Sequence, residues 1–326
     1  MILFILFVPF FIVCFYDIDK KNEIELKYVY NMLIRVKRNA SGLIEEIPFE
    51  EYIVGVLAGE MPIYFEKEAF KAQAVAARSY ALKRMEYNKD NEYDVVDSVM
   101  NQVYLDNDHL KKAWGDNYIT NINKLREVVN ETSGEYLIYD GEVIDAMFFS
   151  TSNGYTEDAI TVFNVDLPYL QSVESFWDSD TSSAFKASKT MSLSEFYKII
   201  GLDYSDNLEV KILKRSSTNR IITLSINGTE FNARNLYNKL GLKSTDFSIE
   251  QMGNEIVINT TGYGHGVGMS QYGALGMAME GYNYKEILNY YYQGTNLKKW
   301  KFSVYIPIFF RKGLNKCKKE KNFLLD

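Results

Sequence analysis

The sequence has few of the residues that form disulfides or bind metals. Among 326 residues there are two cysteines and two histidines. Cys14 lies in an apolar N-terminal run and Cys317 in a lysine-rich tail, and there is no CxxC pair or His/Cys cluster, so we expect no structural disulfide. His109 and His265 together with these cysteines cannot complete a four-ligand zinc site without carboxylates. The sequence therefore predicts no metal and no cofactor.

An excess of positive charge is also lacking. The formal net charge is -7, which argues against nucleic acid or an anionic membrane surface as the main partner. The chain contains no internal repeat and no low-complexity linker. Its length allows one large domain or two ordinary ones, with enough apolar residues for a core.

The first sixteen residues form an apolar run, followed by the charged stretch 17–21. The run is slightly shorter than the about 17–25 residues of a membrane span. It lacks the preceding basic residues and the small-residue cleavage site of a signal peptide. We interpret it as an uncleaved single-pass anchor with the remaining chain outside the cell, and a cleaved signal is the alternative. Lys20 and Lys21 then lie on the outer side, against the positive-inside tendency.

The pattern of apolar residues predicts an α+β fold of mixed helices and antiparallel strands. Strands are expected within 22–41 and 136–149, and helices from about Phe49, over 65–87 and over 121–132. The long helix carries a narrow stripe of alanines at 69, 72, 76 and 77. A short helix and alternating strands between 191 and 256 read as a smaller inserted subdomain. The predicted organisation is an anchor (1–16), a core (22–190 and 257–300), the insert (191–256) and a basic tail (301–326).

Glu60 is the first candidate for a catalytic residue. It lies in the segment Ala58–Pro62, after an apolar helical stretch. Gly59 suits the left-handed residue that ends many helices, and Pro62 prevents the helix from resuming. Glu60 is therefore expected one residue past a helix C-terminus, where the helix dipole raises the carboxyl pKa. A carboxyl that stays partly protonated near neutral pH can act as a general acid, whereas the plainer alternative is a surface glutamate in a loop.

A glycine-rich segment, Gly262–Gly273, is the second unusual stretch. Its first four glycines alternate, which indicates either a close approach of backbone or ligand, or unusual backbone dihedrals. The order fits neither a phosphate loop nor the GxGxxG fingerprint. Ser270 stands where GxSxG would place a nucleophile, but Tyr272 replaces the second glycine. His265, Ser270 and Gln271 can form a polar cluster, and Ser270 can instead cap the helix that follows.

Four motifs together resemble the stage II sporulation protein D family, which includes the amidase-enhancer proteins. The resemblance covers roughly residues 47–297. The motifs are Ala58–Pro62, Lys71–Tyr80, Gln102-Val103-Tyr104, and Gly264–Gly273 with the following Ala274–Ala278. The resemblance implies a membrane-anchored lytic transglycosylase with a central glycan-binding cleft. It also implies action on peptidoglycan during engulfment of the forespore, in the space between the mother-cell and forespore membranes, on strands that a cell-wall amidase or endopeptidase has first denuded of stem peptides.

The resemblance also implies roles for individual residues. The family's catalytic glutamate falls on Glu60. Its signature arginine, histidine, serine and glutamine fall on Arg78, His265, Ser270 and Gln271, and we expect these, with the motif residues Gln102, Tyr104 and Tyr272, to bind substrate. From the residues alone, Arg78 is either a solvated helix arginine or a cleft residue that binds an acidic substrate group.

One departure from the family concerns zinc. Some members carry cysteines and histidines before the Gln-Val-Tyr motif and in a later loop. Here the corresponding segments are 98–101 and 149–156, and they contain neither residue type. The resemblance therefore implies no zinc for this chain, and the loop 149–156 is expected to be held by packing.

Three functions remain open from the sequence. In the first, Glu60 alone protonates the glycosidic oxygen and then accepts the proton of the sugar's own 6-hydroxyl, which closes an anhydro ring without water. In the second, the chain is a non-catalytic glycan-binding enhancer of a partner amidase. In the third, it is a serine or other hydrolase of peptidoglycan. A hydrolase that cleaves glycan normally needs a second carboxylate, for which Asp97, Glu157 and Asp158 are candidates.

Overall fold

The structure is a computed structural model of the chain, and it describes residues 22–26 and 32–300. It confirms the α+β class: helices alternate with small sheets whose strands pair mostly antiparallel. The elements follow in the order β1 (Leu33–Lys37), β2 (Ile44–Pro48), α2 (Phe49–Glu60), α3 (Lys67–Tyr87), β3 (Val95–Val96), α4 (Asn107–Trp114), η2 (Gly115–Asn117), α5 (Tyr118–Glu131), β4 (Glu135–Tyr139), β5 (Glu142–Val143), β6 (Phe148–Phe149), α6 (Ala159–Phe163), α7 (Asp178–Thr181), β7 (Lys186–Ser192), α8 (Leu193–Ile200), β8 (Val210–Arg215), β9 (Ile221–Ile226), β10 (Thr229–Asn232), α9 (Ala233–Leu240), β11 (Phe247–Met252), β12 (Glu255–Thr261), β13 (Met269–Ser270), α10 (Gln271–Met279), α11 (Tyr284–Tyr291) and β14 (Asn296–Lys299).

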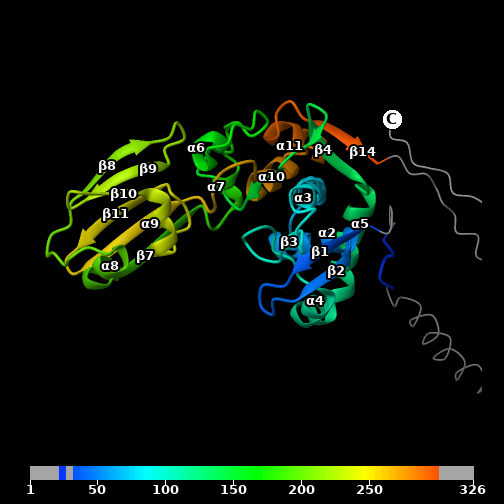
Figure 1. Cartoon of the computed structure of the whole chain (residues 1–326), viewed down its shortest axis with the longest axis horizontal. Coiled ribbons are helices and arrows are strands. Elements are labelled where there is room, and N and C mark those ends of the chain that lie inside the picture. The colour runs from blue at the N-terminus through cyan, green and yellow to red at the C-terminus, as the bar shows by residue number, and fades with distance from the viewer. Residues whose placement is uncertain (1–21, 27–31, 301–326) are drawn as a thin grey trace, which may run out of the picture.

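The larger part of the molecule is built around helix α3. Its predicted alanine stripe, residues 69, 72, 76 and 77, is fully buried. Helices α2, α5, α10 and α11 and strand β4 all contact α3. Small side chains let several elements approach one helix closely, which explains why the stripe is alanine. In Figure 1, α3 accordingly lies in the middle of the right-hand part of the molecule.

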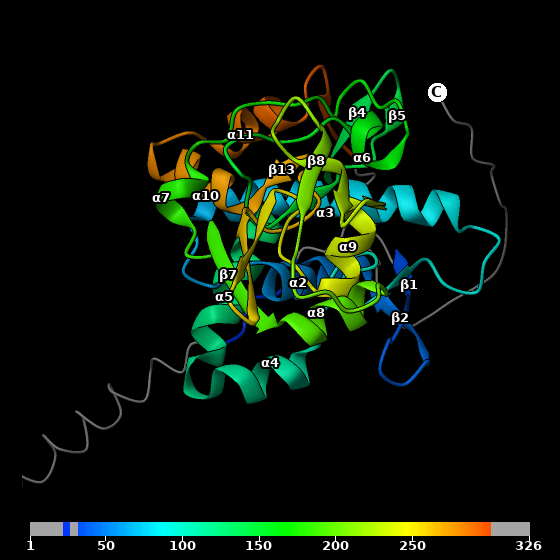
Figure 2. The ribbon, with the colours of Figure 1, turned by 90° about the vertical axis from the view of Figure 1, so that its left-hand side faces the viewer.

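Strands β7 to β12 and helices α8 and α9 pack into a second group. They form two three-stranded sheets, in the orders β11-β12-β7 and β10-β9-β8. A hydrophobic cluster of its own, which includes Phe196, Ile226 and Leu236, lies between these elements. Figure 1 shows the group at the left, and Figure 2 shows it in front of α2 and α3. Strands β7 and β12 begin and end outside the limits 191–256, so the observed sheet is longer than the predicted insert. We call residues 186–261 the inserted region.

The predicted membrane anchor needs correction. Among the described residues, no helix is both long and apolar enough to cross a membrane. Residues 1–16, to which the anchor was assigned, lie outside the described residues, as does the predicted basic tail 301–326. The single-pass anchor and the location derived from it are therefore not retained.

Candidate functional site

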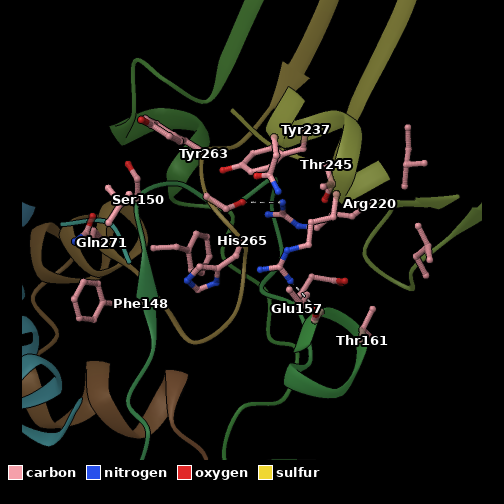
Figure 3. A pocket seen from close by; sticks show the side chains of 18 of the residues that line it. Phe148, Ser150, Glu157, Thr161, Arg220, Tyr237, Thr245, Tyr263, His265 and Gln271 are labelled. Carbon is pink, nitrogen blue, oxygen red and sulfur yellow. Dashed lines mark hydrogen bonds between the residues drawn. The ribbon is translucent and has the colours of Figure 1, made fainter. Parts of the chain in front are cut away.

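A cleft of about 620 Å³ opens between the core and the inserted region. Its charged and ionisable lining comes from two sources. Glu60, Glu157 and His265 belong to the core, and Arg220 and Arg234 to the inserted region. Figure 3 shows Gln271 and Phe148 at one end, His265 in the middle and Arg220 toward the other end. We call the end at Glu60 and Gln271 the acidic end and the end at Arg220 the basic end, and Glu157 lies near Arg220.

Glu60 lies at the acidic end, at the last position of α2. The helix continues through Gly59, whose φ is not positive, so the predicted left-handed helix end is wrong. The half-buried carboxyl of Glu60 has two hydrogen-bond donors. The Val103 backbone N–H donates to Oε1 at 2.6 Å, and Gln271 Nε2 donates to Oε2 at 3.4 Å. The structure therefore brings Glu60 and Gln271 into contact.

The pKa of Glu60 is raised above its usual value, as predicted, but for a different main reason. Burial is the largest cause, because desolvation disfavours the charged carboxylate. The hydrogen bonds from Val103 and Gln271 act in the opposite direction and lower the pKa. Burial therefore favours the acid form while two donors remain ready to stabilise the carboxylate. A group that must first give and later accept a proton needs both.

Two glycines on α2 allow the segment after Gln102 to reach Glu60. A Cβ at Gly59 would lie 2.6 Å from the Val103 carbonyl oxygen, and Gly55 is in similarly close contact with the Tyr104 ring. The Leu105 N–H donates to the Gly55 carbonyl at 3.2 Å. Glycine is thus required at 59 for close backbone approach rather than for an unusual dihedral.

Gln102 and Tyr104 flank Val103, but neither side chain lines the cleft. Gln102 is fully buried, where its Oε1 accepts from the Tyr52 hydroxyl at 3.0 Å. The Tyr104 ring stacks on Tyr52, with the ring centroids 5.4 Å apart. These contacts hold the backbone of Val103 in place, so the part of this motif that touches Glu60 is a main-chain N–H.

Arg78 also lies away from the cleft, and it is not solvated. Its side chain is fully buried and pairs with Glu50, with Nη2 and Nε at 2.9 and 3.2 Å from the two carboxylate oxygens. Nη1 donates to the Glu135 carbonyl at 2.8 Å. The arginine therefore ties α3 to α2 and β4, and neither sequence-based alternative for Arg78 matches this position.

His265 does line the cleft, and its Nδ1 accepts a hydrogen bond from the backbone. Val267 N–H donates to Nδ1 at 3.0 Å, so the proton of the neutral ring is on Nε2. Burial, and then the charges of Arg220 and Arg234, lower the pKa of His265 to about 4. The ring is thus neutral at physiological pH and serves as a wall of the cleft.

Ser270 and Tyr272 lie on either side of Gln271 but have different surroundings. Ser270 is fully buried and does not line the cleft, and it caps α10 by accepting the Gly273 N–H at 3.3 Å, which is the alternative that the sequence left open. Its hydroxyl also donates to Asp178. The Tyr272 hydroxyl lies 3.2 Å from that of Tyr64, outside the cleft. A buried serine without a histidine partner is a poor nucleophile, which weighs against the serine-hydrolase reading.

The polar loop 149–156 is held by a buried carboxylate. Asp178 accepts from the Ser152 N–H at 2.8 Å, from the Ser175 hydroxyl at 2.7 Å and from Ser270. Burial raises the pKa of Asp178, and these donors oppose the rise. The expectation that packing alone holds this loop was incomplete, because a hydrogen-bond network contributes as well.

The alternating glycines behave as expected. Gly262, Gly264, Gly266 and Gly268 all have positive φ, and a Cβ on any of them would meet a neighbouring residue. The glycines are therefore needed both for the close approach of neighbouring residues and for their unusual backbone dihedrals. At Gly266 the close neighbour is the guanidinium of Arg220.

Sequence reasoning missed the basic end of the cleft. Arg220 and Arg234 lie in the inserted region, outside the recognised motifs, and no local spacing marks them. Of the three candidate second carboxylates, only Glu157 lines the cleft. Asp97 pairs with Arg38 at 3.1 Å, and Asp158 accepts the Ser172 N–H at 2.6 Å. Glu157 is almost fully buried, and its Oε1 accepts from Ser216 at 3.1 Å and from Thr218.

The sequence is similar to those of known sporulation proteins. The family model described as Stage II sporulation protein matches residues 37–139. The chain is 44% identical over 271 residues to the Stage II sporulation protein D of Bacillus subtilis (strain 168), which covers 82% of this chain and 79% of that protein. The corresponding protein of Bacillus amyloliquefaciens is 41% identical over 271 residues, which covers 82% of this chain and 78% of that one.

A more distant relative has a different name. The Amidase enhancer of Bacillus subtilis (strain 168) is 30% identical over 302 residues, which is 76% of this chain and 40% of that protein. The extent and identity of these matches show that the chain belongs to the stage II sporulation protein D family, and this membership connects it with sporulation.

Proposed function

We propose that the protein cleaves the glycan strands of peptidoglycan as a lytic transglycosylase, with Glu60 as the single general acid and base. The observation that carries the proposal is the carboxyl of Glu60, which lines the wall of the cleft, has a pKa raised by burial, and contacts two donors. Family membership supports a role in sporulation, and the glycan substrate is part of the proposal.

In the proposed reaction, protonated Glu60 gives its proton to the oxygen of the glycosidic bond as that bond breaks. The resulting carboxylate accepts hydrogen bonds from Val103 and Gln271. It then takes the proton of the 6-hydroxyl of the same sugar, and the 6-oxygen bonds to the anomeric carbon. The products are a new 4-hydroxyl end and a 1,6-anhydro end, and no water is consumed.

A hydrolytic reaction would use a second carboxylate to activate water. Glu157 is the cleft-lining candidate, but hydrogen bonds from Ser216 and Thr218 engage its Oε1, and its side chain is almost fully buried. These contacts favour a structural role for Glu157. They support the single-carboxylate reaction over hydrolysis.

The experiment is a digest of peptide-stripped glycan strands by the wild type and by Glu60→Gln, with mass spectrometry of the product ends. General acid–base catalysis accelerates a reaction by about 10²–10⁴-fold, so the cleavage rate of the variant should fall by about a hundredfold or more. Glu66→Gln is the matched control, because Glu66 is an exposed glutamate six residues further on. It should cleave as the wild type does, and both variants should unfold in a single cooperative thermal transition, which shows that they are folded.

The other outcomes decide between the alternatives. Anhydro ends from Glu60→Gln would move the catalytic role to another residue. Reducing ends from the wild type would identify a hydrolase. The name of the more distant relative favours a second candidate, a glycan-binding enhancer of a cell-wall amidase. That candidate predicts no cleavage by the wild type alone, together with stimulation of a partner amidase that survives Glu60→Gln.

A further inference from the structure

Arg220 is buried in the wall of the cleft with an incomplete set of partners. Its side chain is 2% exposed, and Nη1 donates to the Ser244 hydroxyl at 3.1 Å. Nε and Nη2 have no hydrogen-bond partner among the described residues. Buried donors in native proteins nearly always have a partner, and an unpaired buried charge is costly. The burial also lowers the pKa of Arg220, which reflects the same cost.

The nearest carboxylates do not supply the missing partner. Glu157 and Asp246 both act on Arg220 through their charge, but neither forms an ion pair with it within 4.0 Å in the described part of the chain. Glu157 accepts from Ser216 and Thr218 instead. Asp246 lies 3.6 Å from Arg215 and accepts from Asn153 at 2.9 Å. The acceptor that Arg220 lacks has to come from outside this set.

A second arginine lines the same cleft. Arg234, near the start of α9, is exposed, and its guanidinium lies 4.8 Å from the centre of the Phe163 ring. Its Nη1 donates to the Val162 carbonyl at 2.7 Å. His265 is neutral at physiological pH. With Glu60 protonated, two arginines therefore face a single carboxylate, Glu157, and the cleft favours an anion at its basic end.

The backbone is shaped to admit the guanidinium of Arg220. Gly266 has φ +87°, and a Cβ there would lie 2.9 Å from Cζ, Nε and Nη2. Any other residue would push the guanidinium away. The glycine therefore positions the Nε–Nη2 edge of Arg220, which is the edge that pairs side-on with a carboxylate.

We propose that Arg220 and Arg234 form a carboxylate-binding subsite for the saccharide that occupies the cleft, at the end opposite Glu60. The identity of that saccharide rests on the proposed function. Peptidoglycan offers two carboxylates of this chemistry: the lactyl group of a peptide-free muramic acid, and the free carboxylates of a stem peptide. Because Nε and Nη2 are buried although Arg220 lines the cleft, the contact forms through a shift of the guanidinium or through a bridging water.

The test measures binding in the Glu60→Gln background, so that no ligand is cleaved. Isothermal calorimetry compares a peptide-free muramic-acid-containing tetrasaccharide with the same compound whose lactyl carboxyls are converted to primary amides. A hydrogen-bonded charge is expected to change affinity by about tenfold or more, so the amide should bind that much more weakly. Arg220→Gln and Arg234→Gln should remove this preference, and higher salt should reduce it in the unsubstituted background.

The controls separate charge from folding. Lys211→Gln removes one positive charge from an exposed site on β8 and should leave the preference unchanged. Arg234 is exposed, so Arg234→Gln keeps the test valid if Arg220→Gln does not fold. A tetrasaccharide with intact stem peptides distinguishes the two sources. Arginine-dependent preference for the peptide-free acid identifies the lactyl group, and arginine-dependent binding of the peptide-bearing form alone identifies the peptide carboxylate.

Three results would overturn the proposal. In the first, the acid and the amide bind equally and binding of the peptide-bearing form does not depend on the arginines. In the second, Arg234→Gln prefers the acid over the amide as strongly as Lys211→Gln does. In the third, no glycan binds measurably. The binding measurement does not depend on cleavage. If the digest shows no transglycosylase activity, the binding result therefore remains valid, and if the binding test fails, the result of the digest remains valid.

Discussion

Each end of the cleft contains a buried ionisable group, and the two groups differ in how many hydrogen-bond partners the protein gives them. At the acidic end, Glu60 has a donor on each carboxylate oxygen, and burial favours its neutral form. At the basic end, Arg220 is buried, and two of its nitrogens have no hydrogen-bond partner within residues 22–26 and 32–300. A group that changes its charge during a reaction is served by protein partners for both forms. A group whose partner is the ligand keeps its donors free. The contrast therefore supports the two proposals, catalysis at the acidic end and carboxylate recognition at the basic end.

A second contrast lies between two buried arginines. Arg78 belongs to a recognised motif, yet it pairs fully with Glu50 and the Glu135 carbonyl inside the core. Arg220 belongs to no motif and faces the cleft. A motif residue can therefore stabilise the core, while the proposed ligand contact involves a residue outside the recognised motifs.

Matched substitutions of these arginines test the contrast and should give the largest effect on stability. Arg78→Met leaves Glu50 buried without its cation, and breaking a buried pair costs about 3–5 kcal/mol of unfolding free energy. Arg220→Met leaves no ion-paired carboxylate behind, so its cost should be less than about 2 kcal/mol. Urea denaturation of both variants measures the difference. Equal losses would mean that Arg220 has a structural partner after all.

Two glycines provide a finer test at the basic end. Gly266 and Gly228 have similar positive φ, +87° and +81°, but only Gly266 has a close neighbour, Arg220. Alanine at either position should cost about 1–2 kcal/mol from the left-handed backbone. Gly266→Ala should cost about 1–3 kcal/mol more, because the guanidinium has to move.

The two variants are compared by thermal unfolding and by binding of the peptide-free glycan. Gly266→Ala should weaken the preference for the acid over its amide, and Gly228→Ala should not change it. If both variants bind like the wild type, then the position of the Arg220 guanidinium does not matter for recognition.

The acidic end was far more predictable from the sequence than the basic end. Glu60, Gln271 and the cap at Ser270 lie in motifs that the family resemblance identifies, although the contact between Glu60 and Gln271 joins positions 211 apart in the chain. The cause of the Glu60 pKa shift was not predictable, since it depends on how deeply the cleft buries the carboxyl. The close approach of Val103 was signalled only by Gly55 and Gly59, four residues apart on one face of α2.

The basic end also depends on long-range contacts, but its residues lie outside the recognised motifs. Arg220 meets Gly266 across 46 positions of the chain, and its neighbour Thr218 meets Glu157 across 61. The helices and turns of the inserted region were partly predictable, as the positive φ values of Asn227 and Gly228 confirm. Which of its side chains face the core was not, because the docking of one folded unit on another leaves no periodic pattern in either sequence.

The smallest expected effect concerns the pH dependence of cleavage. Glu60 has to be protonated to act as the acid, so the alkaline limb of the kcat/KM profile should lie above the usual glutamate pKa. Gln271 donates to the carboxylate form and thereby lowers the pKa of Glu60. Gln271→Leu removes this donor, so the pKa should rise further and the alkaline limb should move to higher pH. The hydrogen bond is long, at 3.4 Å, and the shift should be less than about one unit.

Gln171→Leu, at an exposed position, is the control and should leave the profile unchanged. The pH dependence of the free energy of unfolding independently checks that folding raises the pKa of Glu60. A carboxyl whose pKa is raised by folding binds its proton more tightly in the folded state, so the wild type loses stability as pH rises from the unfolded-state pKa through the folded one. Glu60→Gln cannot titrate and should lack this loss. If the alkaline limb of Gln271→Leu instead moves to lower pH, then Gln271 stabilises the protonated form of Glu60 and not its carboxylate.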